Sequence, residues 1–184
     1  MLAEHPSTAQ TFRSRSWTDP RLTVHSSRIH GCGLFACAPI AQGEIVIIWG
    51  GELFTLEDVQ SGRAAEHSYA AIREGIFLGH PAELGNTPDD FMNHSCDPNL
   101  WMIGETTWAA RRDIRPGEEV TGDCAMYWGP DGDGSMRWDC HCGSALCRKA
   151  FTTDDWRRPD LHARYGDHFA PYINERIRQL RHLD

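Results

Sequence analysis

The chain has 184 residues, of which 40% are hydrophobic and 24% charged, a balance that indicates one globular domain and excludes a disordered chain. No apolar run approaches the roughly 20 residues needed to cross a bilayer, and residues 1–20 lack the layout of a signal peptide. We therefore expect a soluble intracellular protein without membrane contact, cytoplasmic or, in a eukaryote, nuclear. The formal net charge of −8 argues against direct nucleic-acid binding and favours a basic protein or peptide partner.

The first third of the chain predicts short strands separated by turns. Residues 1–20 show no sustained period and are expected to form a flexible arm or an edge segment, and a short strand is expected over residues 22–24. The Gly31-Cys32-Gly33 sequence predicts a turn whose backbone can lie close to a ligand. The β-branched and aromatic run 45–49 predicts a buried strand that ends at Gly50 and Gly51.

The middle of the chain continues this pattern. Thr55 is a candidate N-cap for a short helix reaching about residue 63. Short strands are expected over residues 69–78, with Gly75 and then Gly79-His80-Pro81 as breakers. A strand pair is expected at 100–103 and 107–111, followed by a strand at 119–121. Many short strands with frequent turns predict a mostly β domain with short helices and irregular connections.

The segment from residue 91 to 99 crowds polar side chains between apolar runs. Asn93, His94 and Ser95 compete for local backbone hydrogen bonds, and Pro98 has no amide hydrogen for a sheet ladder. The segment is therefore predicted to be a loop that the fold holds in place. Loops of this kind commonly carry binding or catalytic residues.

The cysteines indicate a metal site. Seven cysteines is an odd number, and Cys140, Cys142 and Cys147 lie within eight residues of one another. Cysteines this close are poor disulfide partners but good ligands for one metal ion. A different interpretation, buried thiols acting as small hydrophobic side chains, suits Cys32, Cys37 and Cys124 better.

The carboxyl-terminal third divides into a linker, the cysteine cluster and a tail. Residues 129–135 are rich in glycine and aspartate and predict a linker. In the tail, apolar residues recur at helical spacing and predict a helix that packs on the core. These residues are Tyr172, Ile173, Ile177, Leu180 and Leu183.

Several motifs in a fixed order resemble the SET-domain protein methyltransferases that carry a post-SET zinc segment. They are Gly31-Cys32-Gly33, the strand end at 48–52, Asn93-His94-Ser95-Cys96-x-Pro98-Asn99, the strand at 117–121, and Cys140-x-Cys142-x4-Cys147. The resemblance covers residues 22–151 and implies small curved β-sheets around a knot-like active site. It divides the chain into an arm (1–20), a SET domain (21–128), a linker with the post-SET zinc segment (129–151) and a helical tail (152–184).

The resemblance also implies an activity, two cofactors and their ligands. The activity is methyl transfer from S-adenosylmethionine to a protein lysine amine. The positions that match cofactor contacts are Gly31, Cys32, Gly33, Leu34, Tyr69, Asn93 and His94, and Phe151 would offer the adenine a flat apolar contact. His94 has a second interpretation, as a structural histidine that bonds the backbone. The positions that match a closed, structural Zn²⁺ site are Cys96, Cys140, Cys142 and Cys147.

The chain departs from the family where an aromatic residue and a tyrosine are usual, because Gly122 and Cys124 stand there. Tyr127, Cys124 and Asn93 are the candidate catalytic residues. We expect Tyr127 to supply the missing hydroxyl, since a thiol in an apolar channel stays protonated and direct transfer needs no covalent intermediate. Two alternatives remain at this stage. One is a small or non-lysine acceptor in a channel opened at Gly122 and Cys124, and the other is a catalytically weak module that binds a peptide or cofactor.

Overall fold

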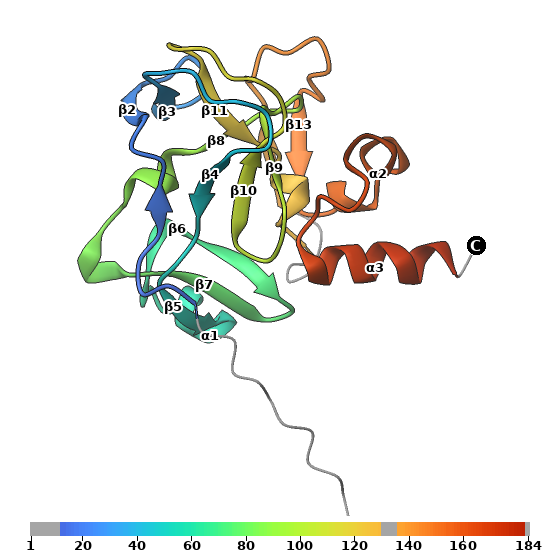
Figure 1. The fold of residues 1–184 in the computed structure, drawn as a ribbon. Coiled ribbons are helices and arrows are strands. Elements are labelled where there is room, and N and C mark those ends of the chain that lie inside the picture. The colour runs from blue at the N-terminus through green and yellow to red at the C-terminus, as the bar shows by residue number, and fades with distance from the viewer. Residues whose placement is uncertain (1–11, 130–135, 183–184) are drawn as a thin grey trace, which may run out of the picture.

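The computed structural model describes residues 12–129 and 136–182, and most of its elements are short strands arranged in small sheets (Figure 1). One four-stranded sheet has the order β1 (Trp17–Thr18), β4 (Ile45–Ile48), β10 (Thr107–Ala110), β9 (Leu100–Met102). The other has the order β2 (Leu22–Ser26), β3 (Cys32–Ala36), β11 (Glu119–Gly122), β8 (Asn93–His94). The mostly β fold expected from the sequence is confirmed.

Two smaller sheets and a few short helices complete the fold. The smaller sheets are β5 (Glu52–Thr55), β7 (Ile76–Pro81), β6 (Ala64–Arg73), and the pair β12 (Arg137–Asp139), β13 (Ala150–Thr152). The α-helices are α1 (Leu56–Gln60), α2 (Pro159–Tyr165) and α3 (Pro171–Arg181). Single 3₁₀ turns are η1 (Ala82–Leu84), η2 (Pro88–Phe91), η3 (Cys124–Met126) and η4 (Asp155–Arg157). Thr55 caps α1 as expected, with a reciprocal hydrogen bond from its own amide to Asp58.

The segment from residue 92 to 99 is irregular, as expected, apart from the two-residue strand β8 (Asn93–His94). β8 pairs in parallel with β11, so that Asn93 lies opposite Thr121 and His94 opposite Gly122. The Ser95 amide continues the pairing by donating to the Gly122 carbonyl at 2.8 Å. Because the sheet satisfies this backbone, the side chains no longer compete for it and are free to form a site.

The expectation that Gly79-His80-Pro81 breaks a strand is wrong. These residues end β7, the central strand of its sheet, and His80 is buried. A Cβ on Gly79 would lie 2.5 Å from the Ser68 carbonyl oxygen. Glycine is therefore needed there for close strand packing, and Pro81 costs little because it is the last residue of the strand.

The tail belongs to the main hydrophobic core. α2 and α3 lie beside the sheets in Figure 1, and the predicted packing helix is confirmed by the burial of Ile173 and Ile177 in α3. The core joins buried residues of the sheets to buried residues of the tail. The tail residues in it are Trp156, Leu161, Tyr165, Phe169, Ala170, Ile173 and Ile177.

The burial of several residues differs from what the sequence predicted. Cys124 is buried as expected, but Cys32 and Cys37 are exposed, because β3 begins at the surface and Cys37 lies in the turn after it. The expected buried strand over 45–49 holds for Val46 and Ile47 only, since Ile45 is 43% exposed. The expected linker falls, apart from Gly129, outside the described residues.

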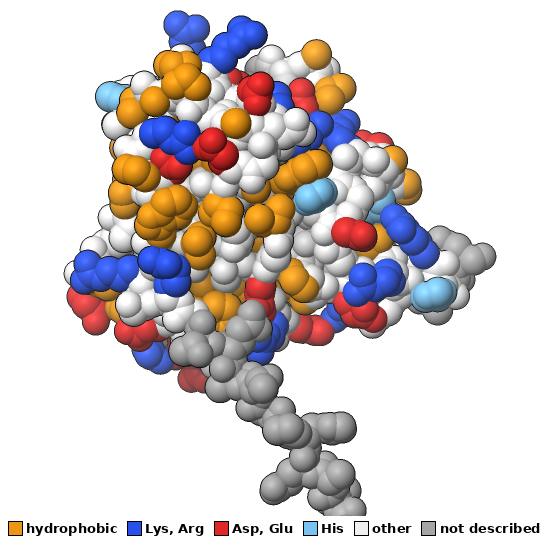
Figure 2. All heavy atoms as spheres, viewed as in Figure 1, with side chains coloured by type: hydrophobic (Ala, Val, Ile, Leu, Met, Phe, Trp, Pro, Cys, Tyr) orange, Lys and Arg blue, Asp and Glu red, His pale blue; other side chains and the backbone are white. Residues whose placement is uncertain are grey.

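The described surface mixes the two signs of charge. Figure 2 shows Lys and Arg side chains interspersed with Asp and Glu across the viewed face. No helix within residues 12–129 and 136–182 is long and apolar enough to cross a membrane.

Candidate active site

Asn93 lies against the Gly31 turn, as the resemblance implied. Its Nδ2 is 2.9 Å from the Cys32 carbonyl oxygen, 3.2 Å from that of His30 and 2.7 Å from Glu119 Oε1. Gly31 has a φ of +46°, which explains the first glycine of the turn. The second glycine, Gly33, is needed for a different reason, because a Cβ on residue 33 would lie 2.2 Å from Glu119 Oε1. Gly33 therefore makes room for the Glu119 and Asn93 side chains.

His94 is buried and joins the end of β11 to the cysteine cluster. Its Nδ1 accepts a hydrogen bond from the Cys124 amide at 3.2 Å, and its Nε2 lies 3.4 Å from Cys96 Sγ. Burial lowers the pKa of His94 to about 4, although Asp123 acts to raise it. The ring is therefore neutral at pH 7, with its hydrogen on Nε2. These contacts match the structural interpretation of His94.

An aromatic cluster lies beside His94. The Phe151 ring stacks on His94 with centroids 4.0 Å apart and on Trp138 with centroids 5.6 Å apart. Trp128 packs on Trp138 at 4.5 Å. Phe151, Trp138 and Trp128 are only partly buried, so they form a partly exposed aromatic surface beside His94. The sequence had indicated Phe151 alone.

The four predicted cysteines converge. The sulfur atoms of Cys96, Cys140, Cys142 and Cys147 all lie within 4.8 Å of one another, and those of Cys96 and Cys140 are 3.6 Å apart. A tetrahedral zinc with bonds of about 2.3 Å has sulfur–sulfur edges of about 3.8 Å. The residues therefore fit a four-thiolate zinc ion. Burial raises the pKa of Cys96 to about 11, so metal binding would release its proton.

Arg148 connects the cysteine cluster to the rest of the molecule. Its guanidinium donates to both carboxylate oxygens of buried Asp123, at 2.7 and 2.8 Å, and to Asp155 at 2.9 Å. Its amide donates to Cys96 Sγ at 3.2 Å. The Tyr165 hydroxyl donates to Asp123 at 2.8 Å. The end of β11, the cysteine cluster and the tail thus share one buried polar network, which the sequence motifs did not indicate.

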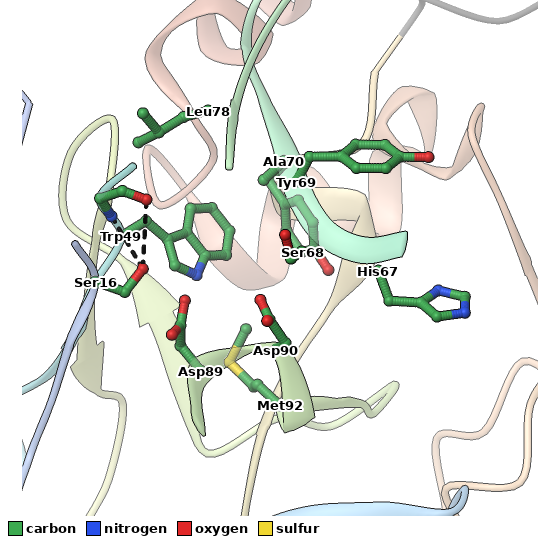
Figure 3. Close-up of a pocket in the computed structure, with 12 residues that line it drawn as sticks. Ser16, Trp49, His67, Ser68, Tyr69, Ala70, Leu78, Asp89, Asp90 and Met92 are labelled. Carbon is green, nitrogen blue, oxygen red and sulfur yellow. Dashed lines mark hydrogen bonds between the residues drawn. The ribbon is translucent and has the colours of Figure 1, made fainter. Parts of the chain in front are cut away.

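A pocket of about 50 Å³ is bounded by residues of β6, β7 and η2 and by Met92 (Figure 3). It is lined by Ser16, Trp49, Gly50, His67, Ser68, Tyr69, Ala70, Leu78, Asp89, Asp90, Met92 and Tyr127. Tyr69, which the resemblance assigned to the cofactor, lies in this pocket on β6 and not among the contacts of Asn93. The sequence analysis did not single out Asp89 and Asp90, which directly precede Phe91. Two adjacent acidic residues next to the polar Asn93 motif could have indicated a binding site.

The Tyr127 hydroxyl lies beside Cys124, the residue that stands where the family usually has a tyrosine. The oxygen lies 3.7 Å from Cys124 Sγ, and the ring is edge-on to Trp49 and Trp108 with centroids 5.0 and 5.7 Å away. Burial raises the pKa of Tyr127 well above its usual value and also raises that of Cys124. Both groups therefore stay protonated at neutral pH, as expected for the thiol.

The expectation of a channel opened at Gly122 is wrong. A Cβ on this residue would lie 2.9 Å from the ring of Trp108 and 3.1 Å from Met92 Cε. Trp108, which is fully buried, and Met92 thus fill the space next to Gly122. The pocket beside Tyr127 stays narrow because the Trp108 side chain from β10 fills the space next to Gly122.

The fold and this site define a SET-domain protein. The SET domain family model matches residues 31–125, just over half of the 184 residues, and the chain belongs to that family. It is similar to the rice histone-lysine N-methyltransferase TRX1, with 29% identity over 80% of this chain and 15% of that protein. It is also similar to cattle histone-lysine N-methyltransferase SETMAR, with 30% identity over 68% of this chain and 50% of that protein.

The fold is shared with a solved structure, the methyltransferase domain of human SETMAR. The TM-score is 0.54 and the identity 24%, over 70% of this chain and 56% of that one. The chain spans half or less of the length of the two named relatives. The likeness to this structure covers a longer part of the chain than the family match does.

Proposed function

We propose that this protein transfers a methyl group from S-adenosylmethionine to the side-chain amine of lysine in a basic protein. The observation that carries the proposal is the arrangement of β8: Asn93 faces the Gly31 turn, and Met92, the preceding residue, faces the pocket of Tyr127. One short segment thus joins a cofactor surface to an acceptor pocket. The relatives named as histone-lysine N-methyltransferases make histones the first substrates to test.

The proposed cofactor surface consists of the Gly31–Leu34 backbone, Asn93, His94 and the aromatic cluster. When bound, S-adenosylmethionine would supply an electrophilic methyl group on its sulfonium. The carbonyl oxygens and the Asn93 amide suit its amino-acid portion, and Phe151 with Trp138 suits the adenine. Cys96, Cys140, Cys142 and Cys147 would hold a structural zinc that fastens the last cysteine-bearing segment next to this surface.

In the acceptor pocket, the residues of this chain align the amine. Methyl transfer to an amine is an in-line displacement that depends on alignment and electrostatics, and the amine must be neutral to react. The buried, un-ionised Tyr127 hydroxyl can hold the amine by a hydrogen bond without presenting a negative charge that would keep it protonated. The alternative of a small or non-lysine acceptor relied on an open channel at Gly122. This support is weakened, because Trp108 and Met92 fill the space there.

The test is methyl transfer from labelled S-adenosylmethionine to core histones, other basic proteins, free lysine and small amines. Label on lysine side chains of a basic protein is the expected result. Label found only on free lysine or small amines would show that the substrate is a small amine and not a protein. Cofactor binding without methyl transfer to any acceptor would support the alternative of a catalytically weak binding module.

Replacing Asn93 by alanine should weaken cofactor binding at least several-fold, since it removes a half-buried amide that positions the Gly31 turn and would contact the ligand. Calorimetric titration with S-adenosylmethionine measures this. Asn86→Ala, which removes an exposed amide bonded to the Glu66 carbonyl, is the matched control and should bind normally. Equal affinity of Asn93→Ala and wild type would contradict the assigned cofactor surface.

The purified protein should contain one zinc ion per chain, measured by elemental analysis. Cys147→Ser removes a ligand and should lower the zinc content and the melting temperature, whereas Cys37→Ser removes an exposed thiol outside the cluster and should change neither. A zinc content far below one per chain in wild type, with free thiols, would refute the site.

A further inference from the structure

Two adjacent carboxylates, Asp89 and Asp90, face the pocket of Tyr127. Figure 3 shows both pointing to the same side of η2, Asp89 toward Trp49 and Asp90 toward Ser68. Asp89 is only 6% exposed, and its Oδ1 accepts a hydrogen bond from the Thr87 hydroxyl at 2.6 Å. No residue in the described parts of the chain donates to its Oδ2. Oδ2 is not one of the fully buried, unpartnered side-chain oxygens of the described residues, so it stays open to the pocket and can accept a hydrogen bond from a ligand there.

Among the described residues, none that lines the pocket carries a permanent positive charge to neutralise these two acids. No Lys or Arg is among the residues that line the pocket. The one imidazole there, His67, is largely exposed and lies 3.6 Å from Glu66. Asp90 accepts from the Thr87 amide at 2.6 Å and caps η2, yet burial, with Asp89 adding to it, raises the pKa of Asp90 to about 7. A cation in the pocket would remove this cost.

The remaining walls indicate which kind of cation fits. Trp49, Tyr69 and Tyr127 give the pocket aromatic walls, and aromatic faces attract ammonium groups. A space of about 50 Å³ takes the end of one side chain and excludes a bulky ligand. Met92 and Leu78 supply apolar contact for an alkyl stem. The combination suits an ammonium group on a straight alkyl chain.

We infer that Asp89 and Asp90 are specificity-determining residues that select the protonated amine of the incoming side chain before it reaches Tyr127. The inference rests on the proposed function for the identity of that side chain as lysine. The inference gives the pocket residues two separate roles. The carboxylates bind the ammonium group first, and the un-ionised Tyr127 hydroxyl then holds the neutral amine for methyl transfer.

The test is an NMR titration of the full chain with n-butylammonium, which mimics the lysine side chain, and with 1-butanol, its neutral counterpart. The wild type should bind n-butylammonium at least tenfold more tightly than 1-butanol. The double variant Asp89→Asn/Asp90→Asn, in which asparagine can still cap η2, should lose this preference. Glu83→Gln makes the same kind of charge change on exposed η1, outside the pocket, and should keep it.

Several results would overturn the inference. If the wild type bound n-butylammonium and 1-butanol equally tightly, the inference would be wrong. This measurement does not depend on whether the double variant folds. A preference that survives in the folded double variant would overturn it as well. Calcium binding that displaces n-butylammonium would make the acids a metal site instead.

Methyl transfer measured in parallel keeps this inference apart from the proposed function. A wild type that selects n-butylammonium through Asp89 and Asp90 but transfers no methyl would refute the function and leave the cation site. An active wild type whose KM for a basic protein is unchanged in the double variant would refute only the cation site. The expected result is a KM raised at least tenfold, with a smaller change in kcat.

Discussion

Tyr127→Phe is expected to lower the turnover number about 100-fold, the usual effect of removing one hydrogen-bonding group that acts on the reacting centre. The ring packs against Trp49 and Trp108, and phenylalanine keeps this packing. Cofactor affinity and melting temperature should therefore change little. Steady-state kinetics, calorimetry and thermal unfolding measure the three quantities separately.

Cys124 provides the control for this prediction. Its thiol lies beside the Tyr127 hydroxyl and is kept protonated by burial, so Cys124→Ala should retain most of the activity. A Tyr127→Phe variant with wild-type turnover would show that the tyrosine only closes the core. Cys124→Tyr, which restores the family residue, should destabilise the protein because its ring needs the space of Tyr127.

Arg148→Met is expected to destabilise the protein by about 3–5 kcal/mol, because it leaves the Asp123 carboxylate buried and uncompensated. The Arg148 side chain is 7% exposed and that of Asp123 is fully buried. The variant also loses the hydrogen bond to Asp155. Urea unfolding of wild type and variant measures the difference in the free energy of unfolding.

The double variant Arg148→Met/Asp123→Asn separates charge from packing. It should recover part of the lost stability, since no buried carboxylate remains unpaired. Arg137→Met, on exposed β12, is a control for the loss of an arginine near the same segment. No recovery in the double variant would mean that Arg148 acts mainly through its packing and its contact with Asp155.

The same pair predicts a pH dependence. Burial acts to raise the pKa of Asp123, but Arg148 holds it below the usual 3.8. The folded pKa is therefore lower than the unfolded one, and the pair stabilises the fold fully above the unfolded value. This stability is lost as the pH falls below about 4 through the folded pKa. Arg148→Met should remove that part of the acid dependence.

Much of the fold could be predicted from the sequence, because local patterns determine it. The capped helix α1, the strand pair β9 and β10 and the packing helix α3 follow from an N-cap, a turn and helical spacing. The cysteine cluster and the motif around Asn93 could also be identified. Thiol spacing within eight residues and an ordered set of motifs are properties of the chain itself.

Only the tertiary structure decided what surrounds each motif. Gly122 suggested an open channel because a sequence shows the missing side chain but not Trp108 from β10, which fills the space. Tyr69 matched a cofactor position in the sequence, and the structure places it in the pocket of Tyr127, because β6 belongs to a separate sheet from β8. Asn93 and His94 form a strand because β11, some 25 residues later in the chain, satisfies their backbone. Such effects depend on residues far apart in sequence, and no local pattern records them.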